Sequence, residues 1–385
     1  MTQSYQPYAV MTKFACLGAD CPDTCCRGWD MPADKAQLAR YEARAPELLA
    51  IIDREANILR REPTGQHCAQ LCEGICSVHK KYGTELLGDA CYFYPRLLHN
   101  VGGSMVMSGA ASCPEMLRLI MHEAAPFVRH TATIERLPAH RRDIVPEGWS
   151  ADSVEAVIDA ALASAADEMQ TPEASMHQLL VLALAMEKST PENWRERWQQ
   201  AMDDAPMPES KEGDSHTLYY ALALTEAFGP PGVSQKLHGI MQTMELALGC
   251  HFTRASREVQ FLDGSKGVQA RLWQRWNMDA RTALEPMLRR WIQAQITLTM
   301  FPFAGFRALD YTARGAVLVQ RFATMRLALM CHVPMSGAAL DEQTVLDVMQ
   351  GVARFMDHLA DADLTMMIHR DAGWQTHARL HGLIG

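Results

Sequence analysis

Cysteines are the residues of this sequence whose type and spacing could do chemistry. Nine of the 11 cysteines lie between positions 16 and 113. A first cluster has the spacing C-x4-C-x3-C-C, and the others follow at wider intervals: Cys16, Cys21, Cys25, Cys26, then Cys68, Cys72, Cys76, Cys91 and Cys113. The N-terminus lacks a basic start followed by an apolar run, so a cytoplasmic protein is expected, and such proteins rarely hold disulfides. Clustered cytoplasmic cysteines indicate a metal site.

The kind of metal stays open from the spacing alone. Structural zinc sites usually combine two short C-x2–4-C units, and here the thiols outnumber the needs of one zinc. Iron–sulfur clusters also take four thiolates, often from distant loops. Reduced structural or redox-active thiols are the third alternative. The C-x3-C-x2-C motif of radical S-adenosylmethionine (SAM) enzymes is absent, and so are the G-x-G-x-x-G and P-loop nucleotide motifs.

The composition excludes several classes of protein. A chain of 385 residues with 48% hydrophobic residues can bury a large core. The formal net charge of −9 argues against nucleic acid as a partner. No apolar run approaches the roughly 20 residues that span a bilayer. The 24 methionines leave peripheral membrane association open, and the sequence also leaves oligomerisation open.

The elements that must position the cysteines are irregular. Residues 1–125 are rich in cysteine, glycine and proline, with one helix expected over 35–61 and a hairpin over 97–107. Helical periodicity dominates from about residue 152, with helix starts at Thr171-Pro172-Glu173 and Thr190-Pro191-Glu192. Further helices are expected over 218–228, 233–248, 268–298, 316–330, 341–360 and 363–383.

These patterns predict a mainly α fold. An irregular, cysteine-rich metal-binding domain (1–125) is expected to pack on a helical domain (126–385), which an exposed linker near 203–215 divides. A break is expected at Glu285-Pro286, because proline removes a backbone N–H from the helix. The basic pairs Arg289-Arg290 and Arg141-Arg142 are interpreted as solvated faces.

Several segments together resemble the flagellin lysine-N-methylase (FliB) family. They are the first cysteine cluster with Gly28-Trp29, the Cys76-Ser77-Val78-His79 segment that leads to Cys91, Tyr94-Pro95-Arg96 and Ser112-Cys113-Pro114-Glu115. The resemblance is specific over residues 14–118 and looser beyond, where it rests on Phe301-Pro302-Phe303 and the order of helices. The N-terminal part also resembles small zinc- or iron-chelating cysteine-rich domains.

The resemblance implies a SAM-dependent enzyme that methylates lysine ε-amines of flagellin and carries a [4Fe-4S] cluster on the cysteine motif. Eight positions match that motif, led by Cys21, Cys25, Cys26 and Cys91, and followed by Cys16, Cys68, Cys76 and Cys113. Since one cluster needs four thiolates, either two metal sites exist or about half of these thiols pack around one. The alternatives to a methyltransferase are an iron–sulfur electron-transfer module and a zinc-stabilised helical adaptor.

Other residues near the cysteines have both a functional and a structural interpretation. Arg96 could clamp the carboxylate of SAM or bond loop carbonyls. Tyr94 could orient a lysine amine or pack in the core, and Trp29 could shield a cluster. One of His67, His79 and His99 could complete or tune a metal site, whereas Cys250 and Cys331 are interpreted as small core residues.

Overall fold

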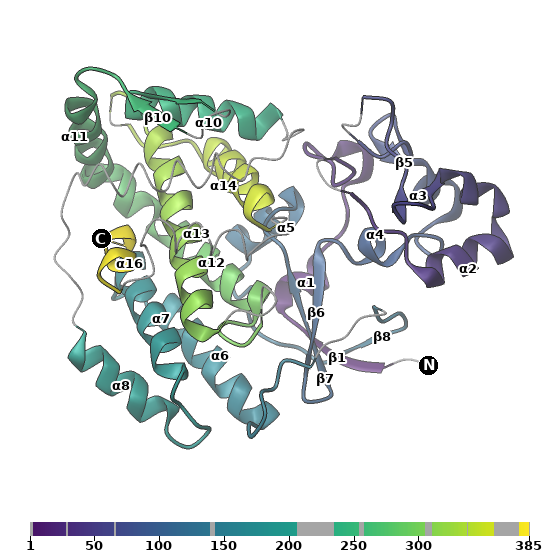
Figure 1. The fold of residues 1–385 in the computed structure, drawn as a ribbon, viewed down its shortest axis with the longest axis horizontal. Helices are drawn as coiled ribbons and strands as arrows, with labels where there is room; N and C mark the ends of the chain where they lie inside the picture. The colour runs from purple at the N-terminus through teal and green to yellow at the C-terminus, as the bar shows by residue number, and fades with distance from the viewer. Residues whose placement is uncertain are drawn as a thin grey trace.

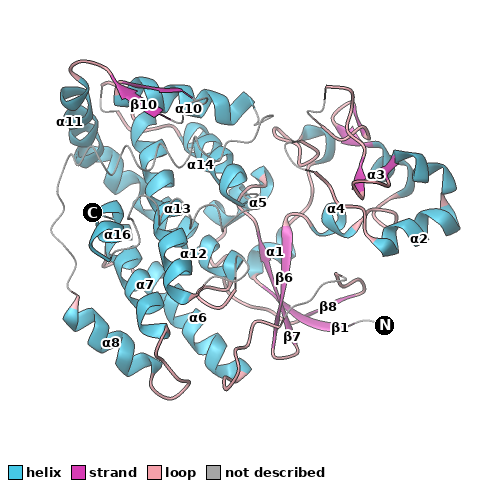
Figure 2. Cartoon of the chain, viewed as in Figure 1, coloured by secondary structure: helices cyan, strands magenta, loops and turns pink. Residues whose placement is uncertain are grey.

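The structure is a computed structural model, and it describes residues 3–27, 30–64, 67–138, 143–205, 235–253, 258–304, 310–336, 338–357 and 377–384. The described chain is mainly helical, with one four-stranded sheet and three small hairpins (Figures 1 and 2). The fold class expected from the sequence, mainly α, is confirmed at this level.

The α-helices are α1 (Ala9–Lys13), α2 (Lys35–Arg44), α3 (Ser77–Tyr82), α4 (Asp89–Phe93), α5 (Pro114–His122), α6 (Ala151–Ala166), α7 (Pro172–Met186), α8 (Trp194–Asp204), α10 (Gln235–Leu248), α11 (Ser265–Arg275), α12 (Arg281–Thr299), α13 (Tyr311–His332), α14 (Glu342–Asp357) and α16 (His377–Ile384). Two 3-10 turns, η1 (Gly18–Asp20) and η2 (Pro46–Ile51), and one π turn, η3 (Trp276–Ala280), complete the helical elements.

The strands are β1 (Gln3–Pro7), β2 (Ile52–Asp53), β3 (Ile58–Leu59), β4 (Leu71–Cys72), β5 (Ile75–Cys76), β6 (Arg96–Val101), β7 (Ser104–Gly109), β8 (Ala132–Ile134), β9 (Cys250–Thr253) and β10 (Glu258–Phe261). The four-stranded sheet has the order β6-β7-β1-β8, and β1 is parallel to β7 but antiparallel to β8. The hairpin β6–β7 confirms the predicted one. Its turn residues Gly102 and Gly103 have positive φ, which glycine adopts at little cost.

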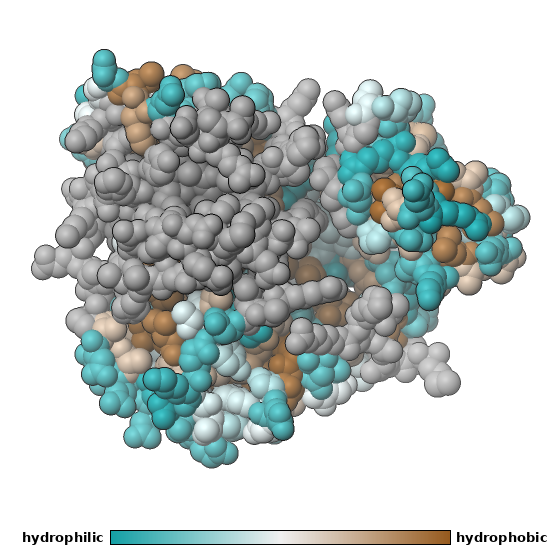
Figure 3. All heavy atoms as spheres, viewed as in Figure 1, coloured by the Kyte–Doolittle hydropathy of each residue, from teal (hydrophilic) through white to brown (hydrophobic). Residues whose placement is uncertain are grey.

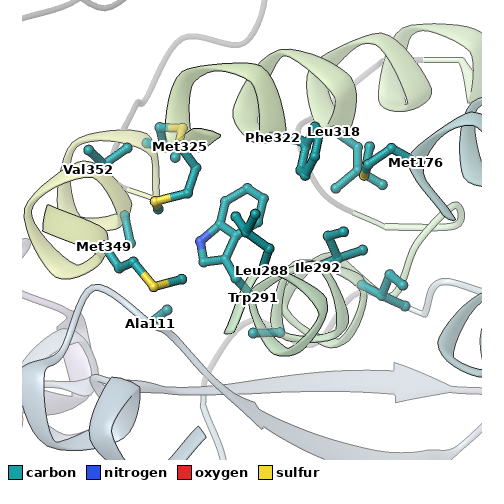
Figure 4. Packing of buried hydrophobic residues seen from close by; sticks show 14 of the residues in the cluster. Ala111, Met176, Leu288, Trp291, Ile292, Leu318, Phe322, Met325, Met349 and Val352 are labelled. Atoms are coloured by element: carbon teal, nitrogen blue, oxygen red, sulfur yellow. The ribbon is translucent and has the colours of Figure 1, made fainter. Parts of the chain in front are cut away.

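A large core joins this sheet to the helices. Helix α13 is buried along almost its whole length and packs on α7, α10 and α14. Trp291 and Leu288 of α12 lie between Phe322 of α13 and Met349 of α14 (Figure 4), and Trp291, Leu288 and Phe322 are fully buried. Gly315 permits a close helix approach, since a Cβ there would lie 2.7 Å from the Cβ of Ala183 on α7.

A small core, built by Cys26 and residues 31–92, lies apart from the large one. Its buried members are Met31, Tyr41, Ala45, Leu48, Ile52, Leu59, Cys68, Val78, Leu86 and Leu87. It lies at the right of Figure 1, where α2, α3 and α4 surround short hairpins. On the face drawn in Figure 3 this part carries mainly hydrophilic residues with scattered hydrophobic ones, as an ordinary solvated surface does. The division of the chain into domains at residue 125 stays a prediction.

Three local predictions were wrong. The helix expected over 35–61 ends at Arg44, and η2 and a β-hairpin follow, because Pro46 cannot continue the hydrogen-bond ladder of α2. The residue that precedes α8 is Asn193 rather than Thr190, although Thr171 does cap α7 by accepting from the N–H of Ala174 at 3.2 Å.

The third error concerns Pro286, which lies inside α12 without breaking it. The irregular turn is η3, upstream of the proline. Leu284 and Leu288, on either side of Pro286, are both buried, so tertiary packing outweighs the lost hydrogen bond. Most of the predicted linker, the helix expected over 218–228, the pair Arg141-Arg142 and most of the helix expected over 363–383 lie outside the described residues.

Candidate metal centre and the adjoining cavity

Helix α14 of the large core holds the loop that carries the first cysteines. Arg354 forms an ion pair with Asp23 at 2.7 Å, and each side chain is 9% exposed. The Nη2 of Arg354 also donates to the carbonyls of Thr24 at 2.8 Å and Arg27 at 2.7 Å. Gln350, one helical turn earlier, donates to Asp23 at 2.9 Å. The backbone around Cys25 and Cys26 is therefore fixed from outside its own segment.

Four thiols gather at the small core: Cys26, Cys68, Cys76 and Cys91. Cys68 donates its N–H to the carbonyl of Cys26 at 2.9 Å. Cys76 precedes α3, and Cys91 lies on α4. Burial raises the pKa of Cys91 most, and nearby thiolates at the other three positions would raise it further. These four groups are close enough to influence one another's charge.

A second group of thiols lies toward the large core: Cys16, Cys21 and Cys113. Cys113 is buried and directly precedes α5. The pKa of Cys113 is raised to about 12, mainly by burial. The charges of Cys21 and Cys16 also raise this pKa, whereas hydrogen bonds from the N–H groups of Met116 and Glu115 lower it. The Sγ of Cys16 accepts a hydrogen bond from the N–H of Gly18 at 3.5 Å, and that of Cys21 donates to the carbonyl of Asp23 at 3.4 Å.

Cys25 and Cys26 connect the two groups. A hydrogen bond between their thiols lowers the pKa of Cys26 and raises that of Cys25. Negative charge on Cys91 of the first group or on Cys16 of the second would also raise the pKa of Cys25. Cys72 lies on β4 and is exposed to solvent.

The donor set consists of thiols, the ligands that iron–sulfur clusters and structural zinc share. Within the described ranges, no three His, Cys, Asp or Glu side chains have the placement expected around a single metal ion. His67 bonds the carbonyl of Cys68 at 2.9 Å and His79 lies on α3, so both are near the first group. Trp29 lies outside the described residues.

Tyr94 and Arg96, the two other residues that the sequence singles out, connect α4 to the sheet: Tyr94 follows α4 and Arg96 is the first residue of β6. The hydroxyl of Tyr94 donates to Ser112 Oγ at 3.3 Å, which places it next to Cys113. Burial raises the pKa of Tyr94, and Cys113 and Cys25 also affect it. Arg96 lies over the rings of Phe14 and Tyr92, at 5.6 and 5.9 Å. In the described part of the chain no carboxylate pairs with Arg96.

A cavity of about 870 Å³ opens beside these residues. Tyr94, Pro95, Arg96 and Phe303 line it, and the buried side chains of Ser112, Arg321 and Asp357 define its inner end. Ser112 and Arg321 are buried, whereas Asp143 and Asp310 at the rim are exposed. The size and the few convergent polar groups are typical of small-molecule sites.

His99 also lines this cavity, rather than joining the thiols. Burial lowers its pKa to about 4, and its ring donates to the carbonyl of Leu298. Its Nε2 is buried without a partner among the described residues, so a neutral ring presents a free acceptor.

The sequence did not reveal the cavity or the residues that tie it to the thiols. Gln350, Arg354 and Asp357 come from α14, more than 200 residues beyond the cysteines, and only the fold brings them there. The spacing of these three residues places them on one face of the helix, which the sequence could have shown. A polar helix face alone, however, does not reveal which segment of the chain it contacts.

The interpretation of Arg289 and Arg290 as solvated was wrong. Arg289 is 7% exposed and donates to the carbonyl of Asp167, while Arg290 donates to the carbonyls of Ile120 and Glu123. Both guanidinium groups satisfy carbonyls at loop and helix ends. Cys250 and Cys331 are buried, as expected of core residues.

Comparison with known proteins gives matches to two lysine-N-methylases and one flagellar biosynthetic protein. The chain is 28% identical over 138 residues to the lysine-N-methylases of Salmonella typhimurium and Salmonella choleraesuis, which covers 33% of this chain and 34% of each relative. The resemblance to the lysine-N-methylase family is confirmed. The flagellar biosynthetic protein FliU of Salmonella muenchen is 28% identical over 128 residues, 30% of this chain and 75% of that protein.

The match to the lysine-N-methylase family is partial. The chain spans about a third of the length of the two methylases it matches. No family model and no solved structure matches. Among the described residues no helix is both long and apolar enough to cross a membrane.

Proposed function

We propose that this protein transfers a methyl group from SAM to lysine side chains of flagellin, and that its cysteines hold a [4Fe-4S] cluster. One observation carries the proposal. Tyr94-Pro95-Arg96 and Phe301-Pro302-Phe303, two segments that underlie the family resemblance, both contribute to the cavity that adjoins Ser112 and Cys113. Residues some 200 positions apart thus form one hollow beside the thiols.

For the cluster, mutual proximity favours Cys26, Cys68, Cys76 and Cys91 as ligands. Cys16, Cys21, Cys25 and Cys113 then surround it as packed thiols or hold a second site. A bound cluster would supply an open iron for the amino and carboxylate groups of SAM, an electron, or a fixed loop structure.

Arg96 would bind the carboxylate of SAM. Its guanidinium lines the cavity and has no ion pair in the described structure, so its donors are open to a ligand. Contacts with the rings of Phe14 and Tyr92 restrict the guanidinium, and a guanidinium can bind a carboxylate in bidentate fashion.

The lysine amine must lose a proton before it can attack a methyl carbon, because its ordinary pKa is about 10.4. A cavity with a buried inner end lowers that pKa by desolvation. The Tyr94 hydroxyl, held by Ser112, lies where it could orient the amine.

The test is anoxic purification of the full chain, followed by measurement of iron, sulfide and zinc and by a SAM assay on flagellin. The proposal expects about four irons and four sulfides per chain and SAM-dependent methylation of lysine. Iron without SAM binding would instead indicate an electron-transfer module. One zinc without sulfide would indicate a zinc-stabilised adaptor. We expect the activity in the cytoplasm, and a peripheral membrane location or an oligomer would not change this test.

A further inference from the structure

The inner end of the cavity contains a buried carboxylate that has no hydrogen-bond partner within the described part of the chain. The side chain of Asp357, the last residue of α14, is 3% exposed. Neither of its oxygens has a hydrogen-bond partner among the residues that the structure describes. A buried carboxylate is costly unless it is both paired and hydrogen-bonded.

Arg321 does not meet this need. Its Nη1 lies 3.6 Å from Asp357 Oδ1, which is longer than a hydrogen bond. The same Nη1 donates to Gln295 at 2.6 Å, and Nη2 donates to the carbonyl of Met356 at 2.8 Å. Burial raises the pKa of Asp357 most, whereas the charge of Arg321 and polar contacts from Gln295 and Ser112 lower it.

The other carboxylates of the cavity are engaged. Asp89 pairs with Arg136 at 2.7 Å, and Asp143 accepts from the N–H groups of Gly102 and Val145. At the rim, Glu187 accepts from the N–H of Thr312 and Asp310 caps α13. Asp357 therefore differs from the rest in its burial and in having an ion-pair partner, Arg321, but no hydrogen-bond donor among the described residues.

The charge of the lining suits a cation. Five carboxylates and three guanidinium groups line the described part of the cavity: Asp89, Asp143, Glu187, Asp310 and Asp357, against Arg96, Arg314 and Arg321. An ammonium has three donors and no acceptor, so it complements a carboxylate that lacks donors. His99, neutral and with a free Nε2, adds a second acceptor.

We propose that the lysine side chain enters this cavity and that Asp357 receives its ε-ammonium and takes one proton from it. The proposal rests on the proposed methyl transfer for its chemical outcome but not for the binding step. The freed nitrogen lone pair forms a bond to the methyl carbon of SAM. The carbon–sulfur bond breaks with its electron pair left on sulfur, and the second amine proton leaves to solvent.

The first test uses binding, not activity. Nα-acetyl-lysine methylamide and its norleucine analogue, which lacks the ammonium, are titrated into the full wild-type chain and observed by NMR. The lysine probe is expected to bind at least about tenfold more tightly than the norleucine probe. Equal affinities, or no binding of the lysine probe, would overturn the assignment without any variant.

The variants then locate the site. D357N should reduce the preference for lysine to about that for norleucine, and D357E should retain part of it. The matched control is D347N, on the same helix, whose carboxylate pairs with Lys236 and is 44% exposed. It should bind as the wild type does. An unchanged preference in a folded D357N would contradict the proposal.

Failure of the proposed function gives a different result. The same wild-type preparation is assayed anoxically with SAM and flagellin. Ammonium-dependent binding that D357N removes, together with no methyl transfer by the wild type, would retain the lysine site and refute the methyltransferase. Methyl transfer by the wild type, together with a lysine preference that D357N leaves unchanged, would retain the methyltransferase and refute the lysine site at Asp357.

Discussion

Arg354 and Asp23 form an ion pair of 2.7 Å that links the last turns of α14 to the cysteine loop. Asp357 follows three residues later, so one helix end contacts both the candidate metal centre and the candidate lysine site. The two sites are mechanically connected through a single rigid element.

Removal of Arg354 should destabilise the protein and its metal centre together. R354A leaves Asp23 buried without a counter-charge, which costs about 3–5 kcal/mol in the free energy of unfolding. Urea unfolding and iron content measure the two effects. R44A is the control, because the pair Arg44–Glu85 is exposed and should contribute less than about 1 kcal/mol. Similar losses for the two variants would refute the role of the buried pair.

Cysteine substitutions should separate ligands from bystanders. C26A and C91A are expected to abolish bound iron and sulfide, whereas C72A, at an exposed position, should retain them. The measurement is iron and sulfide per chain with the visible absorption of the cluster. Full iron content in C26A or C91A would exclude that residue from the ligand set.

Loss of the Arg96 guanidinium should weaken SAM binding. Hydrogen bonds to a charged group contribute roughly 1.5–3 kcal/mol, so R96A should lower the affinity by roughly one to two orders of magnitude. The affinity of R96K for SAM should lie between those of the wild type and R96A, because lysine keeps the charge but cannot bind a carboxylate in bidentate fashion. Calorimetry of SAM binding tests this, with R195A on the exposed face of α8 as a control. Unchanged affinity in R96A would assign the carboxylate to another group.

The large core depends on Leu288. L288A should cost about 2–5 kcal/mol, since this side chain is fully buried beside Trp291 (Figure 4). L246A, at a position that is 82% exposed, should change the free energy of unfolding by less than about 0.5 kcal/mol. Denaturant titration of both variants compares them, and equal effects would contradict the packing described here.

Stability should fall in mild acid because of His99. Its pKa in the folded protein is about 4, below the ordinary 6.5, so the unfolded chain binds more protons between these values. The free energy of unfolding therefore decreases as the pH drops from 6.5 toward 4. H99Q should show a shallower decrease over that window. A wild-type and H99Q difference that is independent of pH would show that the ring is already charged or solvated in the native state.

Local chemistry made parts of this fold predictable. The turn Asn100-Val101-Gly102-Gly103 specifies the β6–β7 hairpin, and Thr171 with Pro172 specifies the start of α7, because each depends on neighbouring residues only. The cysteine region was recognisable from spacing. Pro286 was misjudged because burial of its neighbours outweighs its own preference.

The cavity was beyond such reasoning. Tyr94 and Arg96 were singled out, but their counterparts Phe303, Arg321 and Asp357 are distant in sequence and carry no motif of their own. The grouping of Cys68 and Cys76 with Cys26 and Cys91 likewise depends on the small core, which forms from several separate segments. Only tertiary structure brings these side chains together.

The four-stranded sheet has a further consequence for the thiol-rich segment. The chain leaves the sheet after β1 and returns at β6, two strands away in the same sheet, so residues 14–95 form an insertion anchored at both ends. Removal of the proposed metal should then unfold this insertion as a local unit while the sheet and helices persist. Because the sheet holds both ends of the insertion close together, re-forming the insertion requires little further loss of loop-closure entropy. The metal-free protein should therefore regain its thiol arrangement without global refolding.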